Sequence, residues 1–229
     1  VTGVQTCALP IYIKKATDQI KLEKPSIVFL TTPNNPTGGF IPIEAITELA
    51  QSAKLVGALL VVDEAYAEFS NETSAVSLIP NFENIVVVRT MSKAFALAGA
   101  RIGYLIGNSK IVEVALITRL PYHLSAQSQA IAIVALENYD LLQKEVDLLI
   151  SERERVISDL IGMGFKVLPS SANFLLFSGF KGSSLEVWKS LLDKKVLIRD
   201  VGIPNFLRTT IGTPEENNQF LAAISAHRP

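Results

Sequence analysis

Four side chains between residues 90 and 101 have types that suit one chemical site. Lys93 follows the mostly apolar run 84–88, and a lysine in a desolvated cleft is held partly neutral, so that its amine can condense with an aldehyde. Thr90, Ser92 and Arg101 add two hydroxyls and a forked guanidinium, which are donors that bind a phosphate. A single lysine more often extends its charge into water. Because the neighbours are also compatible, we predict an activated lysine beside a phosphate site.

Two other segments become polar after apolar runs, TTPNNPTGG at 31–39 and VVDEAY at 61–66. Asp63 can keep a ring nitrogen protonated or bind a metal ion, although an aspartate there also suits a helix N-cap. Asn35, held beside a proline, can hydrogen-bond a ligand oxygen or can belong to a plain turn. Tyr66 alone is more typical of a core or rim aromatic. Because the carboxyl ends of parallel strands share one edge of a sheet, we expect the three segments to meet there.

The hydrophobic pattern predicts an α/β protein in which strands and helices alternate. Strands are expected at 26–30, 58–62, 84–89 and 101–106, and helices at 42–55, 125–137 and 141–163. The strands are continuously apolar, which is typical of a mostly parallel sheet covered on both faces. A small α+β domain is predicted after residue 164, with strands at 166–168, 173–177 and around 196 and 206, and helices at 184–194 and from 214.

The composition excludes several classes of partner. With 21 Lys and Arg against 22 Asp and Glu, the net charge of -1 gives no electrostatic reason to bind nucleic acid or an anionic membrane. No apolar run reaches the roughly 18 residues of a membrane span. The single cysteine, Cys7, cannot form an internal disulfide, and the 2 histidines exclude a histidine-rich metal site. We therefore expect a cytoplasmic protein that acts on small molecules and holds no metal ion.

Five residues, in order and spacing, resemble the motif set of the fold-type I pyridoxal-phosphate aminotransferases: Asn35, Asp63, Tyr66, Lys93 and Arg101. Longer motifs are similar to the histidinol-phosphate aminotransferase family within that group, namely PNNPTG, DEAYAEF, RTMSKAFALAGARIG, LPYHLSAQSQA, SSANFLLF and VLIRDVGIPNFLRTTIGTPEEN. The resemblance runs from about residue 12 to the C-terminus. It implies transamination of histidinol phosphate with glutamate and 2-oxoglutarate in histidine biosynthesis, with pyridoxal 5'-phosphate as the cofactor.

The resemblance also implies a role for each matched residue around that cofactor. Lys93 is the catalytic residue, which binds the cofactor aldehyde and, once released, moves a proton between the substrate Cα and the cofactor. Asp63 pairs with the pyridine nitrogen and keeps the ring an electron sink. The remaining contacts are Asn35 and Tyr66 at the phenolic oxygen, and Thr90, Ser92 and Arg101 at the phosphate.

For the substrate, the resemblance implies recognition by two arginines. Arg208, in NFLRTTIG, is expected to bind a carboxylate, and Arg199, in VLIRD, is expected to reach the phosphate of histidinol phosphate. Each arginine can instead be a surface residue at a strand edge. Asn173 and Tyr122 are expected to line the pocket, with a structural role as the alternative. A homodimer is implied, since sites of this family form at the subunit interface.

The N-terminal segment departs from the family. Residues 1–11, VTGVQTCALPI, match the in-frame translation of a common DNA-sequencing adapter, so we expect a non-native tail, with a frayed terminus as the alternative. The family is longer at this end, where it carries a phosphate-gripping turn, a ring-stacking aromatic and an intersubunit arm. We therefore expect a fragment with open apolar faces, poor solubility and weak cofactor binding. Its expected parts are a partial large domain at 12–140, an interdomain helix at 141–163 and a small C-terminal domain at 164–229.

Other interpretations of the same motifs stay open. An aromatic-amino-acid aminotransferase or a threonine-phosphate decarboxylase uses the same cofactor site, because specificity lies in the substrate pocket. The run LLVVDE also resembles the magnesium-binding strand end of P-loop ATPases. No GxxxxGK[ST] sequence appears, however, and an ATPase leaves Lys93, Arg101 and Arg208 without a role. A third interpretation is that the chain is a non-catalytic fragment. Its motifs would then still derive from the same family.

Overall fold

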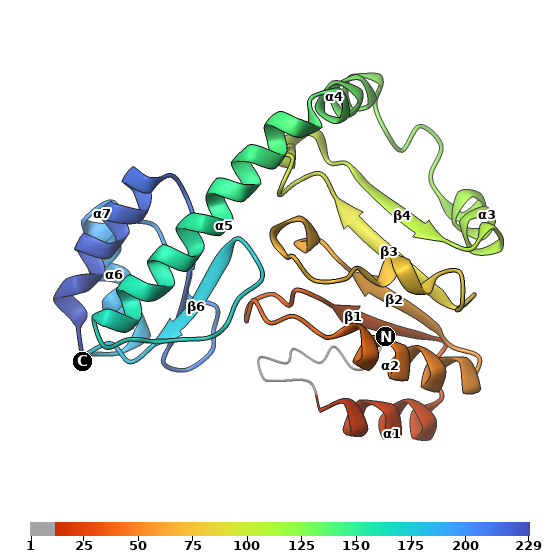
Figure 1. Cartoon of the computed structure of the whole chain (residues 1–229), viewed down its shortest axis with the longest axis horizontal. Helices are drawn as coiled ribbons and strands as arrows, with labels where there is room; N and C mark the ends of the chain where they lie inside the picture. The colour runs from red at the N-terminus through yellow and green to blue at the C-terminus, as the bar shows by residue number, and fades with distance from the viewer. Residues whose placement is uncertain (1–11) are drawn as a thin grey trace. The chain divides into compact units, whose positions relative to one another are not determined.

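The computed structural model describes residues 12–229, which form two compact units (Figure 1). Among these residues, the first unit contains 12–33 and 40–143, and the second contains 34–39 and 144–229. The long helix α5 (Tyr139–Gly162) continues from one unit into the other. The tail predicted at residues 1–11 lies outside the described residues, and the domain boundaries predicted at residues 140 and 163 stay predictions.

A four-stranded sheet with the order β1-β2-β3-β4 forms the centre of the first unit. Strands β1 (Ile27–Thr31), β2 (Leu59–Asp63) and β3 (Ile85–Thr90) are parallel, and β4 (Gly103–Gly107) runs antiparallel to β3. The predicted mostly parallel sheet is therefore confirmed. Because Thr31 pairs with Asp63 and Asp63 pairs with Val88, the carboxyl ends of the three parallel strands lie side by side.

The core of the first unit forms between this sheet and helices α1 (Ile13–Glu23) and α2 (Ile43–Leu55). Ile46 on α2 and Leu60 and Ile85 on the strands are completely buried. Each such side chain contributes about 1.5–3 kcal/mol through its removal from water. Helix α1 was not assigned from the sequence, because its one apolar stripe is narrow and charged residues surround it.

Parts of the first unit remain exposed. Ile27 and Phe29 on β1 are 48% and 75% exposed, so the prediction of a sheet covered on both faces is wrong for this strand. Strand β1 is at the edge of the sheet, and the described helices cover one of its faces only. Helices α3 (Ser109–Thr118) and α4 (Ala126–Glu137) contain no buried residue in the described chain. Three short 3-10 helices lie in the connections between strands: η1 (Ala67–Phe69) and η2 (Ala75–Leu78) between β2 and β3, and η3 (Ala98–Ala100) between β3 and β4.

The second unit is the predicted α+β arrangement. Its antiparallel sheet has the order β5-β6-β7, formed by β5 (Lys166–Val167), β6 (Phe174–Ser178) and β7 (Phe206–Thr210). Helices α6 (Ser184–Asp193) and α7 (Pro214–Ile224) both begin with a capping box, and η4 (Ser225–His227) follows α7. The core joins Leu160 of α5, Leu191 of α6 and Phe220 of α7 to Phe177 of the sheet. The strand predicted around residue 196 is not formed, because Arg199 makes only an isolated bridge to Arg208.

Candidate functional site

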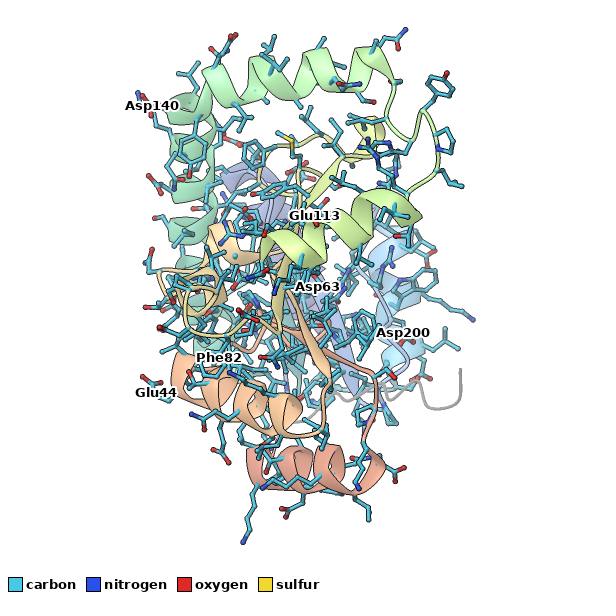
Figure 2. All side chains as sticks on the ribbon, turned by 90° about the vertical axis from the view of Figure 1, so that its right-hand side faces the viewer. Glu44, Asp63, Phe82, Glu113, Asp140 and Asp200 are labelled. Carbon is cyan, nitrogen blue, oxygen red and sulfur yellow. The ribbon has the colours of Figure 1, made fainter. Side chains whose placement is uncertain are left out.

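The ends of β2 and β3 bring several of the predicted residues together in the first unit. Asp63 is the last residue of β2, and Thr90 is the last residue of β3 (Figure 2, where Asp63 is labelled). The Asp63 carboxylate accepts a hydrogen bond from the backbone N–H of Ala65 at 3.0 Å. This bond holds the side chain over the turn that follows the strand, and it leaves the second carboxylate oxygen available for a ligand.

Lys93 lies in the loop after β3 and faces the ring of Tyr66. Its Nζ is 5.5 Å from the ring centroid, and Tyr66 is 7% exposed. A cation at this distance from an aromatic face is attracted by the ring electrons. Lys93 itself is exposed, so the desolvated cleft expected around it is not formed by residues 12–229. The structure thus places Lys93 and Tyr66 next to each other, which the sequence did not predict, whereas the predicted exclusion of water from Lys93 is not found among residues 12–229.

Thr90 and Ser92 form a pair of hydroxyls directly before this lysine. Their Oγ atoms are 2.9 Å apart, and the Thr90 hydroxyl also accepts the backbone N–H of Ser92 at 3.0 Å. The Thr90 hydroxyl lies 3.2 Å from the carbonyl of Ile102, which follows Arg101. Arg101 is exposed, with φ of 55°, and its Nη1 donates to the carbonyl of Ala98 at 3.0 Å. Two hydroxyls and one guanidinium are therefore available at this strand end to an anionic ligand.

Asn35 belongs to the second unit, where it meets Arg208. The loop 34–39 is held by the N–H of Ser171, which donates to the carbonyl of Gly38 at 2.8 Å. Gly38 has φ of 79°, and a Cβ there would lie 2.2 Å from the Ser170 hydroxyl oxygen, so this position requires glycine. The Arg208 guanidinium donates to the Asn35 side-chain oxygen. The sequence did not indicate this pairing, because the two residues are 173 positions apart.

A pocket of about 430 Å³ in the second unit contains both predicted substrate arginines. It is lined by Trp188, Leu197, Ile198, Arg199, Asp200, Arg208 and Thr210. Backbone hydrogen bonds of 2.9 Å in both directions join Arg199 to Arg208, and the Arg208 guanidinium lies 4.8 Å from the Phe174 ring centroid. Two guanidiniums in one concave site suit an anionic ligand. Trp188, which was missed, fixes one wall by donating its indole N–H to the carbonyl of Ile198 at 2.9 Å.

The other two predicted pocket residues have different surroundings. The carbonyl of Asn173 accepts the N–H of Ile211 at 2.9 Å, which joins the start of β6 to the end of β7. Tyr122, in the first unit, is 100% exposed and has φ of 52°. Their contribution to a substrate pocket stays a prediction.

A buried polar cluster next to the strand ends was also missed. Glu64 follows Asp63 and is 2% exposed, and it forms an ion pair with Arg89, which precedes Thr90. Both oxygens of Glu68 are buried without a hydrogen-bond partner among residues 12–229, although one lies 3.7 Å from Arg89. Burial raises the pKa of the Glu68 carboxyl, and this effect outweighs the opposing influence of the local backbone and of Arg89. The sequence feature that could have indicated this cluster is the position of Glu64 and Arg89 directly beside the predicted site residues Asp63 and Thr90.

The described residues contain neither a candidate metal site nor a candidate membrane-spanning helix. Among residues 12–229, no three His, Cys, Asp or Glu side chains gather in a way that suits a metal ion. Within the same residues, no helix combines the length and the hydropathy needed to cross a membrane.

Comparison with known proteins agrees with the motifs. Residues 8–224 match the family model Aminotransferase class I and II. The histidinol-phosphate aminotransferase of Mycolicibacterium vanbaalenii is 49% identical over 210 residues, which are 91% of this chain and 56% of that enzyme. That of Streptomyces avermitilis is 46% identical over 225 residues, which are 98% of this chain and 61% of the enzyme. The chain thus spans little more than half the length of these relatives.

Solved structures show the same fold. The histidinol-phosphate aminotransferase of Clostridium acetobutylicum has a TM-score of 0.87 and 27% identity, covering 94% of this chain and 67% of that one. The Sinorhizobium meliloti enzyme, solved with pyridoxal-5'-phosphate, has a TM-score of 0.80 and 26% identity, covering 93% and 60%. A threonine-phosphate decarboxylase from Porphyromonas gingivalis, at 24% identity, shows likeness of fold alone. The predicted α/β fold of the fold-type I enzymes, with a partial large domain and a small α+β domain, is confirmed.

Proposed function

Because this chain belongs to the class I and II aminotransferase family, we propose that it is part of a pyridoxal-phosphate-dependent histidinol-phosphate aminotransferase. Its reaction is the transfer of an amino group between histidinol phosphate and the glutamate and 2-oxoglutarate pair. The observation that carries the proposal is the grouping of Lys93, Tyr66 and the Thr90 and Ser92 hydroxyls at the neighbouring ends of β2 and β3. The names of relatives that match most of the chain support the choice of substrate.

The side chains at the ends of β2 and β3 have the chemistry that pyridoxal phosphate requires. When bound, the cofactor supplies an aldehyde that condenses with amines and a pyridine ring that accepts electrons. The amine of Lys93 is the group that holds the aldehyde, and in its free, neutral form Nζ takes the proton from the substrate Cα. The carboxylate of Asp63 favours a protonated pyridine nitrogen, because a nearby negative charge stabilises the positively charged form of the ring.

The remaining donors complete the same proposal. Thr90, Ser92 and Arg101 are assigned to the cofactor phosphate, because two hydroxyls and a guanidinium suit its three oxygens. The Tyr66 hydroxyl and the Asn35 amide are assigned to the phenolic oxygen of the cofactor ring, and both groups can donate a hydrogen bond to it.

Arg208 and Arg199 are assigned to the substrate. They share one pocket in the second unit, and each guanidinium can bind a carboxylate or a phosphate through two parallel hydrogen bonds. Asn173 and Tyr122 remain candidate pocket residues. A homodimer and a cytoplasmic location belong to the same proposal. The apolar side chains of α3 and α4, such as Ile117 at 82% and Val134 at 57% exposure, are compatible with a surface covered by a further protein segment.

The test is to identify which lysine takes up the cofactor. The 229-residue chain is mixed with limiting pyridoxal phosphate and reduced with borohydride, and the modified lysine is mapped by peptide mass spectrometry. We expect selective modification of Lys93, with surface lysines such as Lys110 modified at least tenfold less. Lys93→Arg is the control, and it is expected to abolish the selective product while the chain stays folded. Uniform modification of all lysines by the wild-type chain would contradict the proposal for this chain.

A further inference from the structure

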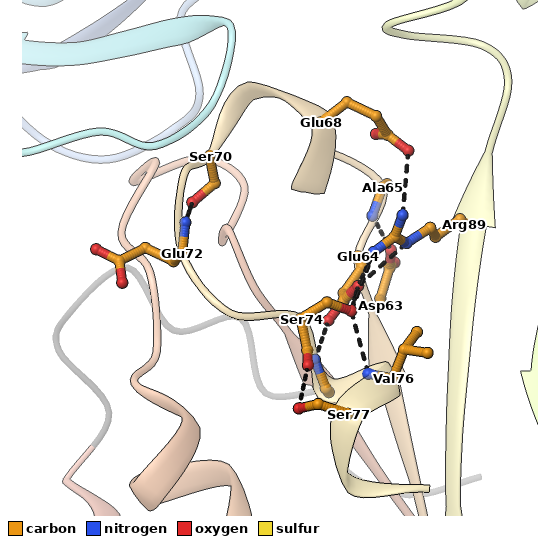
Figure 3. Close-up of polar contacts among 11 residues, drawn as sticks. Asp63, Glu64, Ala65, Glu68, Ser70, Glu72, Ser74, Val76, Ser77 and Arg89 are labelled. Atoms are coloured by element: carbon orange, nitrogen blue, oxygen red, sulfur yellow. Dashed lines mark hydrogen bonds and ion pairs between the residues drawn. The ribbon is translucent and has the colours of Figure 1, made fainter.

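A buried salt bridge joins three elements of the first unit (Figure 3). Nε and Nη2 of Arg89 donate to the same oxygen, Oε2, of Glu64, at 3.1 and 2.8 Å. The Ser74 hydroxyl donates to that oxygen at 2.8 Å and itself accepts Nη2 of Arg89 at 3.0 Å. The second oxygen of Glu64 accepts the backbone N–H of Ala75 at 2.7 Å. The cluster therefore ties the end of β2, the end of β3 and the first turn of η2 to one carboxylate.

The position of this cluster in the sequence places it one residue away from the proposed cofactor contacts. Glu64 follows Asp63, and Arg89 precedes Thr90. Adjacent side chains in extended backbone point to opposite sides, so the Glu64 and Arg89 pair lies on the side away from Asp63 and Thr90. The backbone continues the connection, because the N–H of Glu64 donates to the carbonyl of Val88 at 2.9 Å. The cluster can thus control the geometry of the strand ends without competing for the ligand.

Burial of the charged groups in this cluster opposes changes in its geometry. The side chain of Glu64 is 3% exposed and that of Arg89 is 21% exposed, so both charges are largely removed from water. A buried carboxylate is tolerated only when its lone pairs are satisfied, and here both oxygens have strong donors. Movement of either strand end relative to the other would break charged hydrogen bonds that water does not replace. The pair therefore resists changes in the separation of the two strand ends.

We infer that the Glu64–Arg89 pair is a positioning device, which holds the loop carrying Thr90, Ser92 and Lys93 in fixed register with Asp63. This inference rests on the proposed function, because it takes those four residues as the cofactor contacts. Glu64 and Arg89 act through the backbone and do not touch the ligand. Arginine is required rather than lysine, because two N–H groups of one planar side chain must reach Glu64 while one also reaches Ser74.

The test compares two charge-neutralising variants of buried glutamates. Glu64→Gln breaks the positioning pair. Glu152→Gln is the matched control, because Glu152 is also buried and also bonded by an arginine, Arg155, but lies on α5 in the second unit. Arg89→Lys keeps the charge and removes the fork. All are made in the 229-residue chain and compared at the same interval below their unfolding temperatures.

The first readout needs no cofactor. Peptide-resolved hydrogen exchange is measured over residues 90–97, whose N–H groups at Met91, Ser92, Ala96 and Leu97 are hydrogen-bonded. We expect exchange there to be at least tenfold faster in Glu64→Gln, about threefold to tenfold faster in Arg89→Lys, and within twofold of wild type in Glu152→Gln. Faster exchange confined to residues 74–78, with 90–97 unchanged, would show that the cluster only anchors η2 and would overturn the inference.

The second readout is the pyridoxal phosphate concentration that gives half-maximal modification of Lys93. Relative to the wild-type chain, we expect this concentration to rise at least fivefold in Glu64→Gln. In Glu152→Gln it should stay within twofold of the wild-type value. Equal values in the two variants would overturn the inference even if Glu64→Gln is less stable. If the wild-type chain shows no selective modification, the proposed cofactor site fails in this chain, and the exchange rates over 90–97 alone decide the positioning role.

Discussion

The two units each contain a buried glutamate that is bonded by an arginine, and the two pairs differ in what they connect. Glu152 and Arg155 are three residues apart on one helix, where Nε and Nη2 of the arginine reach different oxygens at 2.9 and 2.6 Å. Glu64 and Arg89 are 25 residues apart, and both arginine N–H groups share one oxygen. The other oxygen of Glu64 is therefore left to bind the backbone of a third element.

This difference separates a local contact from one that holds strands together. The helix places Glu152 and Arg155 on the same face whether or not the rest of the unit forms, and Asn217 of α7 adds a hydrogen bond of 2.8 Å. Glu64 and Arg89 meet only after β2 and β3 have paired. The first contact strengthens an element that already exists, whereas the second fixes the relation between two elements that carry proposed site residues.

The largest expected effect on the unfolding free energy comes from removing Arg89. Removal of Arg155 provides the comparison. Arg89→Met leaves the Glu64 carboxylate buried without its charge partner, and we expect a loss of about 3–5 kcal/mol in unfolding free energy. Arg155→Met is expected to cost about 1 kcal/mol, because the Arg155 side chain is 36% exposed and water can replace it. Urea unfolding followed by circular dichroism measures both values, and the fluorescence of Trp188 reports on the second unit. Equal losses would remove the distinction between the pairs.

Replacement of Glu68 is expected to have a smaller effect on the unfolding free energy, and to raise it rather than lower it. Burial raises the pKa of this carboxyl in the folded chain, so ionisation at neutral pH costs stability. The penalty is complete above the raised folded pKa and disappears as the pH falls below the unfolded value of 4.5. Glu68→Gln should therefore stabilise the chain by about 1 kcal/mol at pH 7, with the gain lost below the unfolded pKa. Thermal unfolding across this pH range tests the sign, and destabilisation by Glu68→Gln at pH 7 would refute it.

The smallest effect on the unfolding free energy is expected from replacing Glu152. The Glu152 carboxylate stabilises the fold at neutral pH, whereas that of Glu68 destabilises it. Hydrogen bonds from Arg155 and Asn217 lower the pKa of the Glu152 carboxyl in the folded chain. Its contribution is therefore present above the unfolded value of 4.5 and is lost as the pH falls through the lowered folded value. Glu152→Gln should destabilise by at most about 1 kcal/mol at pH 7 and should match wild type in acid. A stabilising effect at pH 7 would show that the ion pair does not support the fold.

The fold was largely predictable because its signals are local. The apolar runs at 58–62 and 84–89 predicted β2 and β3, and the helical pattern of residues 42–55 predicted α2. Helix α3 was missed because residues such as Ile111 and Val112 favour strands, while the Asn108 side chain caps the helix by accepting the N–H of Lys110 at 3.1 Å. The exposed face of β1 was also missed, since a continuous apolar run does not reveal which face is covered.

The candidate site was predictable where its residues follow one strand. Thr90, Ser92 and Lys93 lie within four positions, so their proximity follows from chain connectivity. The exposure of Lys93 did not follow, because burial depends on every segment packed around a side chain. The contacts of Asn35 with Arg208, and of Trp188 with Ile198, were likewise hidden, since each joins residues from different elements.

The sequence by itself determined the types of side chain, the strands and helices that carry them, and the family to which the chain belongs, because these depend on local order and composition. Only the tertiary structure decided that Glu64 and Arg89 meet, that Glu68 is buried beside them, and that Arg199 and Arg208 share a pocket. Such contacts depend on strand register and on the exclusion of water by distant segments. Electrostatic interactions are strong only where that exclusion occurs.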